Sequence, residues 1–172
     1  MNDSDDDPGY ESRWRRRCDL LYQVKVTYRY HRRRQRFWDI TDKGTKALTV
    51  LLGASLLGET LKHHLPLVAS LISGLGLLAL VFGYSDRKQS HKECAETAMQ
   101  LVGRIEEIPM SRLDEVQLSQ LVAEHARQNA KEPPALKTLV VICEYEESVS
   151  LGHPDQVPLP CLSRRIFADF IS

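Results

Sequence analysis

The alternation of hydrophobic and polar positions divides the chain into a helical head, an apolar middle and a helical tail. Residues 11–42 contain no proline and no glycine. Apolar residues recur there at the spacing of one helical face, at Trp14, Cys18, Leu21, Val24 and Tyr28. Residues 47–84 hold one acid and one base, Glu59 and Lys62. We therefore predict an all-α protein, with a long basic amphipathic helix over 11–46 and an apolar middle over 47–84.

The apolar middle has the length that a bilayer requires. Residues 65–84 form a run of 20 residues without a charge, and a bilayer core about 30 Å thick needs roughly 20 helical residues. Residues 47–61 form a shorter run, which neighbouring lysine stems can extend by reaching toward the interface. We predict a two-helix transmembrane hairpin. The alternatives are a single span over 65–84 and a buried hairpin of a soluble protein.

The distribution of charge predicts the orientation. Residues 13–46 carry 12 Lys and Arg against three Asp, although the whole chain balances 23 bases with 23 acids. Arg87, Lys88 and Lys92 follow the second apolar run, whereas only Lys62 lies between the two runs. Because basic flanks are retained in the cytoplasm, we expect both termini to be cytoplasmic. The acidic first residues do not resemble the positive start of a secretory signal.

Small residues recur along both apolar runs at spacings that let helices approach closely in lipid. They are Ala54, Gly58, Ser70, Gly74, Gly76, Ala79 and Gly83. The pattern fits packing within the hairpin or between copies of the chain. Two helices alone cannot bury the small-residue faces of both runs and also keep Glu59 away from lipid. A polar group that faces lipid is costly. We therefore expect a homo-oligomer.

A basic surface precedes the first apolar run. Its members are Arg29, Arg32, Arg33, Arg34 and Arg36, followed by the aromatic residues Phe37 and Trp38. Such a run can bind nucleic acid, or it can lie near anionic lipid and set the topology, with the aromatics at the interface. Its position beside a spanning segment favours the lipid bilayer as the partner, and we expect no nucleic acid.

The tail over residues 85–151 is predicted to be helical. A first apolar face ends at Pro109 and comprises Cys94, Ala98, Leu101, Ile105 and Ile108. We expect this helix to run back along the basic head as a coiled pair, with its acids facing the basic residues; these acids are Glu93, Glu96, Glu106 and Glu107. Residues 1–10 are expected to be disordered and residues 152–172 to form a loop with a short amphipathic end.

A second tail helix is predicted to open at Ser111, with Asp114 in a capping position. Its apolar residues are expected at Leu113, Val116, Leu121, Val122 and Ala126. Residues 139–143 are compatible with a buried strand or a helix. The helical spacing of the surrounding apolar residues and the helical neighbourhood favour a helix.

Candidate sites are few. The sequence contains no P-loop, G-x-G-x-x-G, H-E-x-x-H or G-x-S-x-G motif, so we predict no catalytic residues, no cofactor and no enzyme. His91 and Cys94 have the spacing of half a metal site, but no second pair accompanies them, and we predict no metal. A candidate pore mouth comprises Glu59, Lys62, His63 and His64. The plainer alternative is an interfacial Glu59–Lys62 pair beside an ordinary turn.

A basic helix ending in RYHRRRQRFWD, a tight two-span hairpin and a tail with an E-x-P-P turn before an apolar helix follow one another over residues 11–152. This arrangement resembles the SLATT-type two-transmembrane proteins of bacteria. The resemblance implies a location in the bacterial inner membrane. It also implies an effector of a conflict system, in which a nucleotide-linked sensor triggers oligomeric pores. We expect that sensor to be a separate cytosolic protein.

The sequence thus favours an oligomeric, pore-forming or membrane-perturbing effector. Two alternatives stay open. The first is a membrane-anchored scaffold whose cytosolic helices recruit a partner. The second is a soluble helical protein that binds nucleic acid through its arginines.

Overall fold

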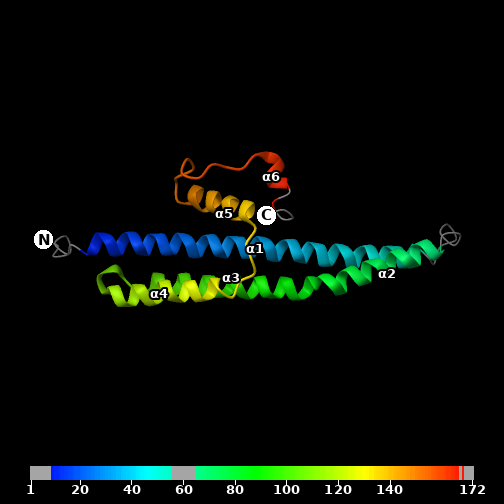
Figure 1. Ribbon diagram of the computed structural model, residues 1–172, viewed down its shortest axis with the longest axis horizontal. Coiled ribbons are helices and arrows are strands. Elements are labelled where there is room, and N and C mark those ends of the chain that lie inside the picture. Colours follow the sequence, from blue (N-terminus) through cyan, green and yellow to red (C-terminus); the bar gives the residue numbers. More distant parts are fainter. Residues whose placement is uncertain (1–8, 56–64, 167, 169–172) are drawn as a thin grey trace. The chain divides into compact units, whose positions relative to one another are not determined.

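The computed structural model describes residues 9–55, 65–166 and 168 (Figure 1). Within these residues all regular structure is helical, which confirms the predicted all-α class. In chain order the elements are α1 (Tyr10–Ser55), α2 (Leu65–Phe82), α3 (Tyr84–Glu107), η2 (Met110–Arg112), α4 (Glu115–Asn129), α5 (Lys137–Ser150) and α6 (Leu162–Ile166). The chain divides into two compact units. Unit 1 comprises residues 1–32 and 92–172, and unit 2 comprises residues 33–91.

The first hydrophobic core of unit 1 joins α1 to α3 and α4. Leu20 and Val24 of α1 are buried in it. The other buried members come from α3, α4 and the turn between them, and are Ala98, Leu101, Val102, Ile105, Leu113, Leu118 and Leu121. The predicted apolar face of the first tail helix, now α3, is therefore buried, and it packs against the basic helix α1.

A second core lies on a different face of α1. Val26 and Tyr30 pack there against Leu139, Ile142 and Cys143 of α5 and against Ala168, two residues beyond the end of α6. Figure 1 shows α5 on the opposite side of α1 from α3 and α4. In unit 1, α1 is therefore a central helix that is covered on two sides.

The predicted single apolar stripe on α1 is wrong in its first members. Trp14 is 43% exposed and Cys18 is exposed, whereas Leu20, Val26 and Tyr30 are buried. A stripe with one period assumes one partner surface. Because α1 has two partner surfaces, its buried residues occupy two faces and mask the periodicity of each.

The second tail helix starts later than predicted. Residues Met110–Arg112 form the 3₁₀ helix η2, and α4 begins at Glu115. Asp114 is the N-cap: its Oδ1 accepts a hydrogen bond from the backbone N–H of Gln117 at 2.6 Å, and the Gln117 side chain accepts one from the Asp114 N–H at 3.4 Å. This reciprocal pair is a capping box, which satisfies two N–H groups that a helix start leaves without partners.

The later start changes which residues of α4 are buried. Leu118, Leu121 and His125 face inward, whereas the predicted Val116 is 65% exposed. Residues 139–143 lie inside α5, so the helical interpretation of that segment is confirmed. The helix boundary before Pro109 is also confirmed, because α3 ends at Glu107.

Gly83 separates α2 from α3. Its φ is +54°, a left-handed conformation that glycine adopts without steric cost. Its N–H donates to the Ala79 carbonyl at 3.1 Å, and its own carbonyl accepts from Arg87 N–H at 3.0 Å. Gly83 therefore has a conformational role at the junction of the two helices.

Candidate functional site

The first candidate feature is the apolar helix α2 of unit 2. Among the described residues, one helical stretch contains a window long and apolar enough to cross a membrane; it begins at Leu65. Only 6% of that window is buried, whereas the core helix of a soluble protein hides most of its apolar residues. Leu80 and Val81 are 79% and 76% exposed. The helix thus presents large apolar side chains outward along its length.

Helix α2 nevertheless has an inner face. Val68 is almost completely buried, and Ile72, Leu75 and Ala79 follow it at helical spacing with partial burial. Ser70 and Gly74 lie on the opposite side of the helix, because each residue advances about 100°. Ser70 is exposed, and a Cβ added at Gly74 would meet nothing within 4 Å. Among the described residues, nothing therefore lies in contact with the Cβ position of Gly74, and Ser70 beside it is exposed.

The remaining predicted small residues differ in their surroundings. A Cβ added at Gly76 also meets nothing within 4 Å, and Ala54 is exposed near the end of α1. Gly58 lies outside the described residues. So do the four residues of the candidate pore mouth, Glu59, Lys62, His63 and His64.

The second feature is an aromatic–cation cluster within unit 2, formed by Arg34, Phe37, Trp38, Tyr84 and Arg87. The Trp38 and Tyr84 rings stack with centroids 5.8 Å apart. The Arg34 guanidinium lies 5.1 Å from the centroids of both Phe37 and Trp38. The Arg87 guanidinium lies 5.3 Å from the Trp38 centroid. Cation–π attraction and ring stacking join α1 to α3 here.

Ion pairs extend this cluster along the same helices. Lys88 Nζ lies 3.3 Å from Asp39 Oδ1, and Lys43 Nζ lies 2.7 Å from Asp39 Oδ2. The hydrogen bond from Lys43, followed by that from Lys88, lowers the pKa of the Asp39 carboxyl. Both acids of this part of α1 are matched by bases, because Lys46 also lies 2.8 Å from Asp42.

The predicted basic residues have unlike environments. Arg32 and Arg36 are exposed, whereas Arg34 is buried within the aromatic–cation cluster. Arg29 belongs to unit 1, where its Nε lies 2.6 Å from Glu147 Oε2. Lys25 Nζ lies 3.4 Å from Glu106 Oε1. This pair is one of the predicted contacts between bases of the first helix and acids of the first tail helix. Arg16 pairs with Glu115 of α4, which was not among the acids predicted to face the basic helix.

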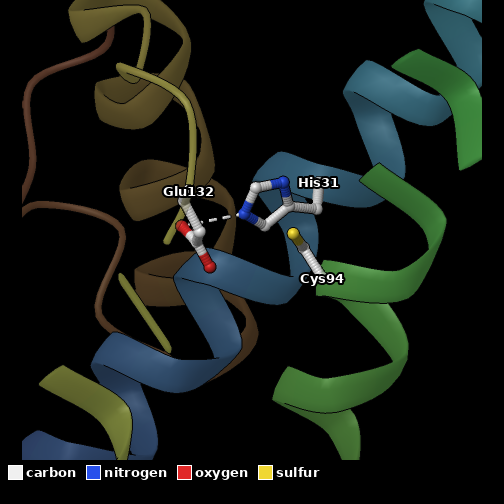
Figure 2. A group of neighbouring side chains, drawn as sticks. All are labelled: His31, Cys94 and Glu132. Carbon is white, nitrogen blue, oxygen red and sulfur yellow. Dashed lines mark ion pairs between the residues drawn. The ribbon is translucent and has the colours of Figure 1, made fainter. Parts of the chain in front are cut away.

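The third feature is a group of three polar side chains in unit 1 whose proximity the sequence pattern did not predict. It comprises His31 of α1, Cys94 of α3 and Glu132, which follows α4 (Figure 2). One nitrogen, sulfur or oxygen atom from each lies within 4.8 Å of the other two. The His31 side chain is fully buried, and its Nε2 lies 2.9 Å from Glu132 Oε2. Cys94 is half-buried, and Figure 2 shows its sulfur beside the imidazole.

The electrostatics of this group reflect burial and the Glu132 charge. Burial raises the pKa of the Cys94 thiol, and the negative charges of Glu132 and Glu93 raise it further. Nearby on α4, His125 is only 6% exposed. Burial lowers the pKa of its imidazole, while the charge of Glu132 opposes that shift. His125 Nε2 is buried without a hydrogen-bond partner among the residues that the structure describes.

The sequence did not predict this group because His31 lies far along the chain from Cys94, His125 and Glu132. One signal was available: His125 continues the helical spacing of Leu118 and Leu121. Comparison of the chain with protein families, with curated proteins and with solved structures finds no match.

Proposed function

We propose that this chain is a two-span membrane protein with both termini in the cytoplasm, and that it acts as an oligomeric, SLATT-like effector that perturbs the membrane. The single observation that carries the proposal is the outward-facing apolar surface of α2. Only 6% of the apolar window that begins at Leu65 is buried. A contiguous exposed surface of this kind marks a membrane or protein contact. In water it would oppose solubility, whereas in lipid it is the stable arrangement.

The aromatic–cation cluster supports the proposed orientation. Trp and Tyr favour the membrane–water interface, and Lys and Arg are retained on the cytoplasmic side. Trp38, nine residues before the first apolar run, stacks on Tyr84 at the end of the second, and Arg34 and Arg87 both lie against the Trp38 ring. A cytoplasmic collar at this level would hold the two runs of a hairpin side by side. It would also leave unit 1 in the cytoplasm.

The unpacked Ser70–Gly74 side of α2 supports self-association. In lipid, helices associate where small residues permit close backbone contact. Gly74 has open space around the position of a Cβ, so its small size serves no contact within the described part of one chain. We propose that this side of α2 contacts α2 of a second copy.

A membrane-anchored scaffold is the second candidate. The two hydrophobic cores of unit 1 favour it, because they give the cytoplasmic part a folded body of its own. Leu162 and Val116, both strongly exposed in unit 1, offer apolar contacts to a partner. In that function the apolar runs only attach the chain to the membrane.

Inducible expression with an impermeant dye separates the two functions. Gly74→Leu adds a bulky side chain on the proposed contact side, where an added Cβ meets nothing within 4 Å among the described residues. Leucine is favourable in a membrane span, so the amount of membrane-bound protein should stay unchanged. We expect dye entry and chemically cross-linked oligomers to fall together.

Ala69→Leu is the matched control. Ala69 is exposed, and it lies about 140° around the helix from Gly74, so this variant should behave like the parent. Dye exclusion by the parent chain, with full membrane attachment, would exclude the effector function and favour the scaffold. Recovery in the soluble fraction after cell lysis would contradict both and support the nucleic-acid alternative.

A further inference from the structure

We propose that His31, Cys94 and Glu132 bind one transition-metal ion of the zinc class within unit 1. This site is independent of the membrane function proposed above, because its residues lie outside the apolar runs. It would connect α1, α3 and the segment that follows α4. Such a connection is a metal clamp between helices that otherwise associate through hydrophobic packing and surface ion pairs.

The geometry of the three side chains fits a small tetrahedral ion. Bonds from zinc to imidazole nitrogen, carboxylate oxygen and thiolate sulfur measure about 2.0–2.3 Å, which places ligand atoms roughly 3.3–3.8 Å apart in a tetrahedron. The ligand atoms observed here lie within 4.8 Å of one another, and the His31–Glu132 pair is at 2.9 Å. Side-chain adjustments of about an ångström would therefore suffice to surround an ion.

The positions of the ligands follow from the packing of the first core. On α1, His31 lies two turns beyond the buried Val24, and on α3, Cys94 lies one turn before the buried Ala98. The two helices thus place a nitrogen and a sulfur at the same end of their shared core. Helical bundles build metal sites in this way, from inward-facing side chains on neighbouring helices.

His125 is an independent observation that points to a ligand. Its imidazole lies one turn beyond Leu121 on the inner face of α4 and is 94% buried, since its exposed fraction is 6%. Its Nε2 is without a hydrogen-bond partner among the described residues, which is uncommon for a buried polar atom. The Glu132 charge acts on this imidazole as well as on Cys94. His125 is not among the side chains whose ligand atoms lie within 4.8 Å of one another, so we assign the fourth position of the ion to water, or to His125 after a rotation of its side chain.

The chemistry of the donors selects the metal. One thiolate, one or two imidazoles and one carboxylate suit Zn²⁺, whereas Mg²⁺ and Ca²⁺ prefer sites made of oxygen. His31 Nε2 lies 2.9 Å from Glu132 Oε2, so binding of a metal through Nε2 requires that the imidazole carry its proton on Nδ1. The Cys94 thiol also loses its proton to solvent, because the thiolate is the ligand.

The test uses the full chain in detergent, stripped of metal with a chelator. Zn²⁺ is titrated in competition with a chromophoric chelator, and Co²⁺ is added separately as a spectroscopic probe. We expect one ion per chain and a cobalt–thiolate charge-transfer absorption. Cys94→Ser should abolish that absorption, and His31→Gln and Glu132→Gln should each weaken Zn²⁺ binding by about 100-fold or more. His125→Gln should weaken binding comparably only if His125 is the fourth ligand.

Cys18→Ser is the matched control, because Cys18 is an exposed thiol on α1 and its loss should leave binding unchanged. Where a variant fails to fold, alkylation of the unmodified chain gives the answer: bound Zn²⁺ should protect Cys94 from iodoacetamide and leave Cys18 reactive. Absence of stoichiometric Zn²⁺ binding, or binding without protection of Cys94, would overturn the proposal. The three residues would then form only a polar group around the buried His31.

Discussion

Arg29 Nε donates a hydrogen bond of 2.6 Å to Glu147 Oε2 and thereby joins α1 to α5 within unit 1. The Glu147 side chain is only 4% exposed, whereas that of Arg29 is 34% exposed. A carboxylate buried in this way has lost most of its hydration, and Arg29 replaces part of it. The sequence pattern predicted that Arg29, like the neighbouring arginines, lies near anionic lipid and sets the topology. The contact with Glu147 instead gives Arg29 a structural role in unit 1.

Replacement of Arg29 should therefore destabilise unit 1. We expect Arg29→Gln to lower the free energy of unfolding by about 1.5–3 kcal/mol, the range for a hydrogen bond to a charged group. Chemical denaturation of the detergent-solubilised chain measures this change. Arg36→Gln is the control, because Arg36 is exposed two turns further along α1. It should change stability by less than about 0.5 kcal/mol, and equal effects of the two variants would contradict the structural role.

The first core predicts a large effect at Leu101, which is fully buried between α1, α3 and α4. Leu101→Ala removes three carbon atoms and leaves a cavity, so we expect a loss of about 2–5 kcal/mol. Met99→Ala, two residues earlier on the same helix, alters a side chain that is half exposed and should cost far less. Denaturant midpoints compare the two. Similar midpoints would show that the packing of α3 against α1 is not the main source of stability.

The start of α4 can be tested by its cap. Asp114→Ala removes the side chain that accepts from Gln117 N–H and should lower stability by about 0.5–2 kcal/mol. Ser111→Ala changes a residue of η2 and should be nearly neutral. The reverse order of effects, measured by thermal unfolding, would favour the helix start at Ser111 that the sequence pattern suggested.

Acid should weaken unit 1 through Glu124. The guanidinium of Arg104 donates a hydrogen bond to Glu124 and holds the pKa of that carboxyl below its ordinary value of 4.5. A lowered folded-state pKa means that the contribution is fully present above pH 4.5 and is lost as the pH falls through the folded-state pKa. Since both side chains are partly exposed, we expect less than about 1 kcal/mol. In Glu124→Gln, this part of the acid sensitivity should disappear from denaturation curves recorded between neutral and acid pH.

Local sequence information was sufficient for several elements. The helical class, the end of α3 before Pro109 and the helical state of residues 139–143 follow from periodicity and from the inability of proline to continue a helix. The apolar run that begins at Leu65 is likewise recognisable from its composition alone. These features depend on residues that are close together in the chain, so an argument from spacing can reach them.

Tertiary contacts decided which side chains are used. Because α1 packs against two different surfaces, its burial pattern departs from a single stripe and places Val24 and Tyr30 in separate cores. The pairing of Arg29 with Glu147 and the meeting of His31, Cys94 and Glu132 join segments far apart in sequence. No spacing rule connects such residues, since their distance depends on how whole helices pack. The sequence alone determined the helices and the apolar run, and the packing of those helices determined the buried polar site.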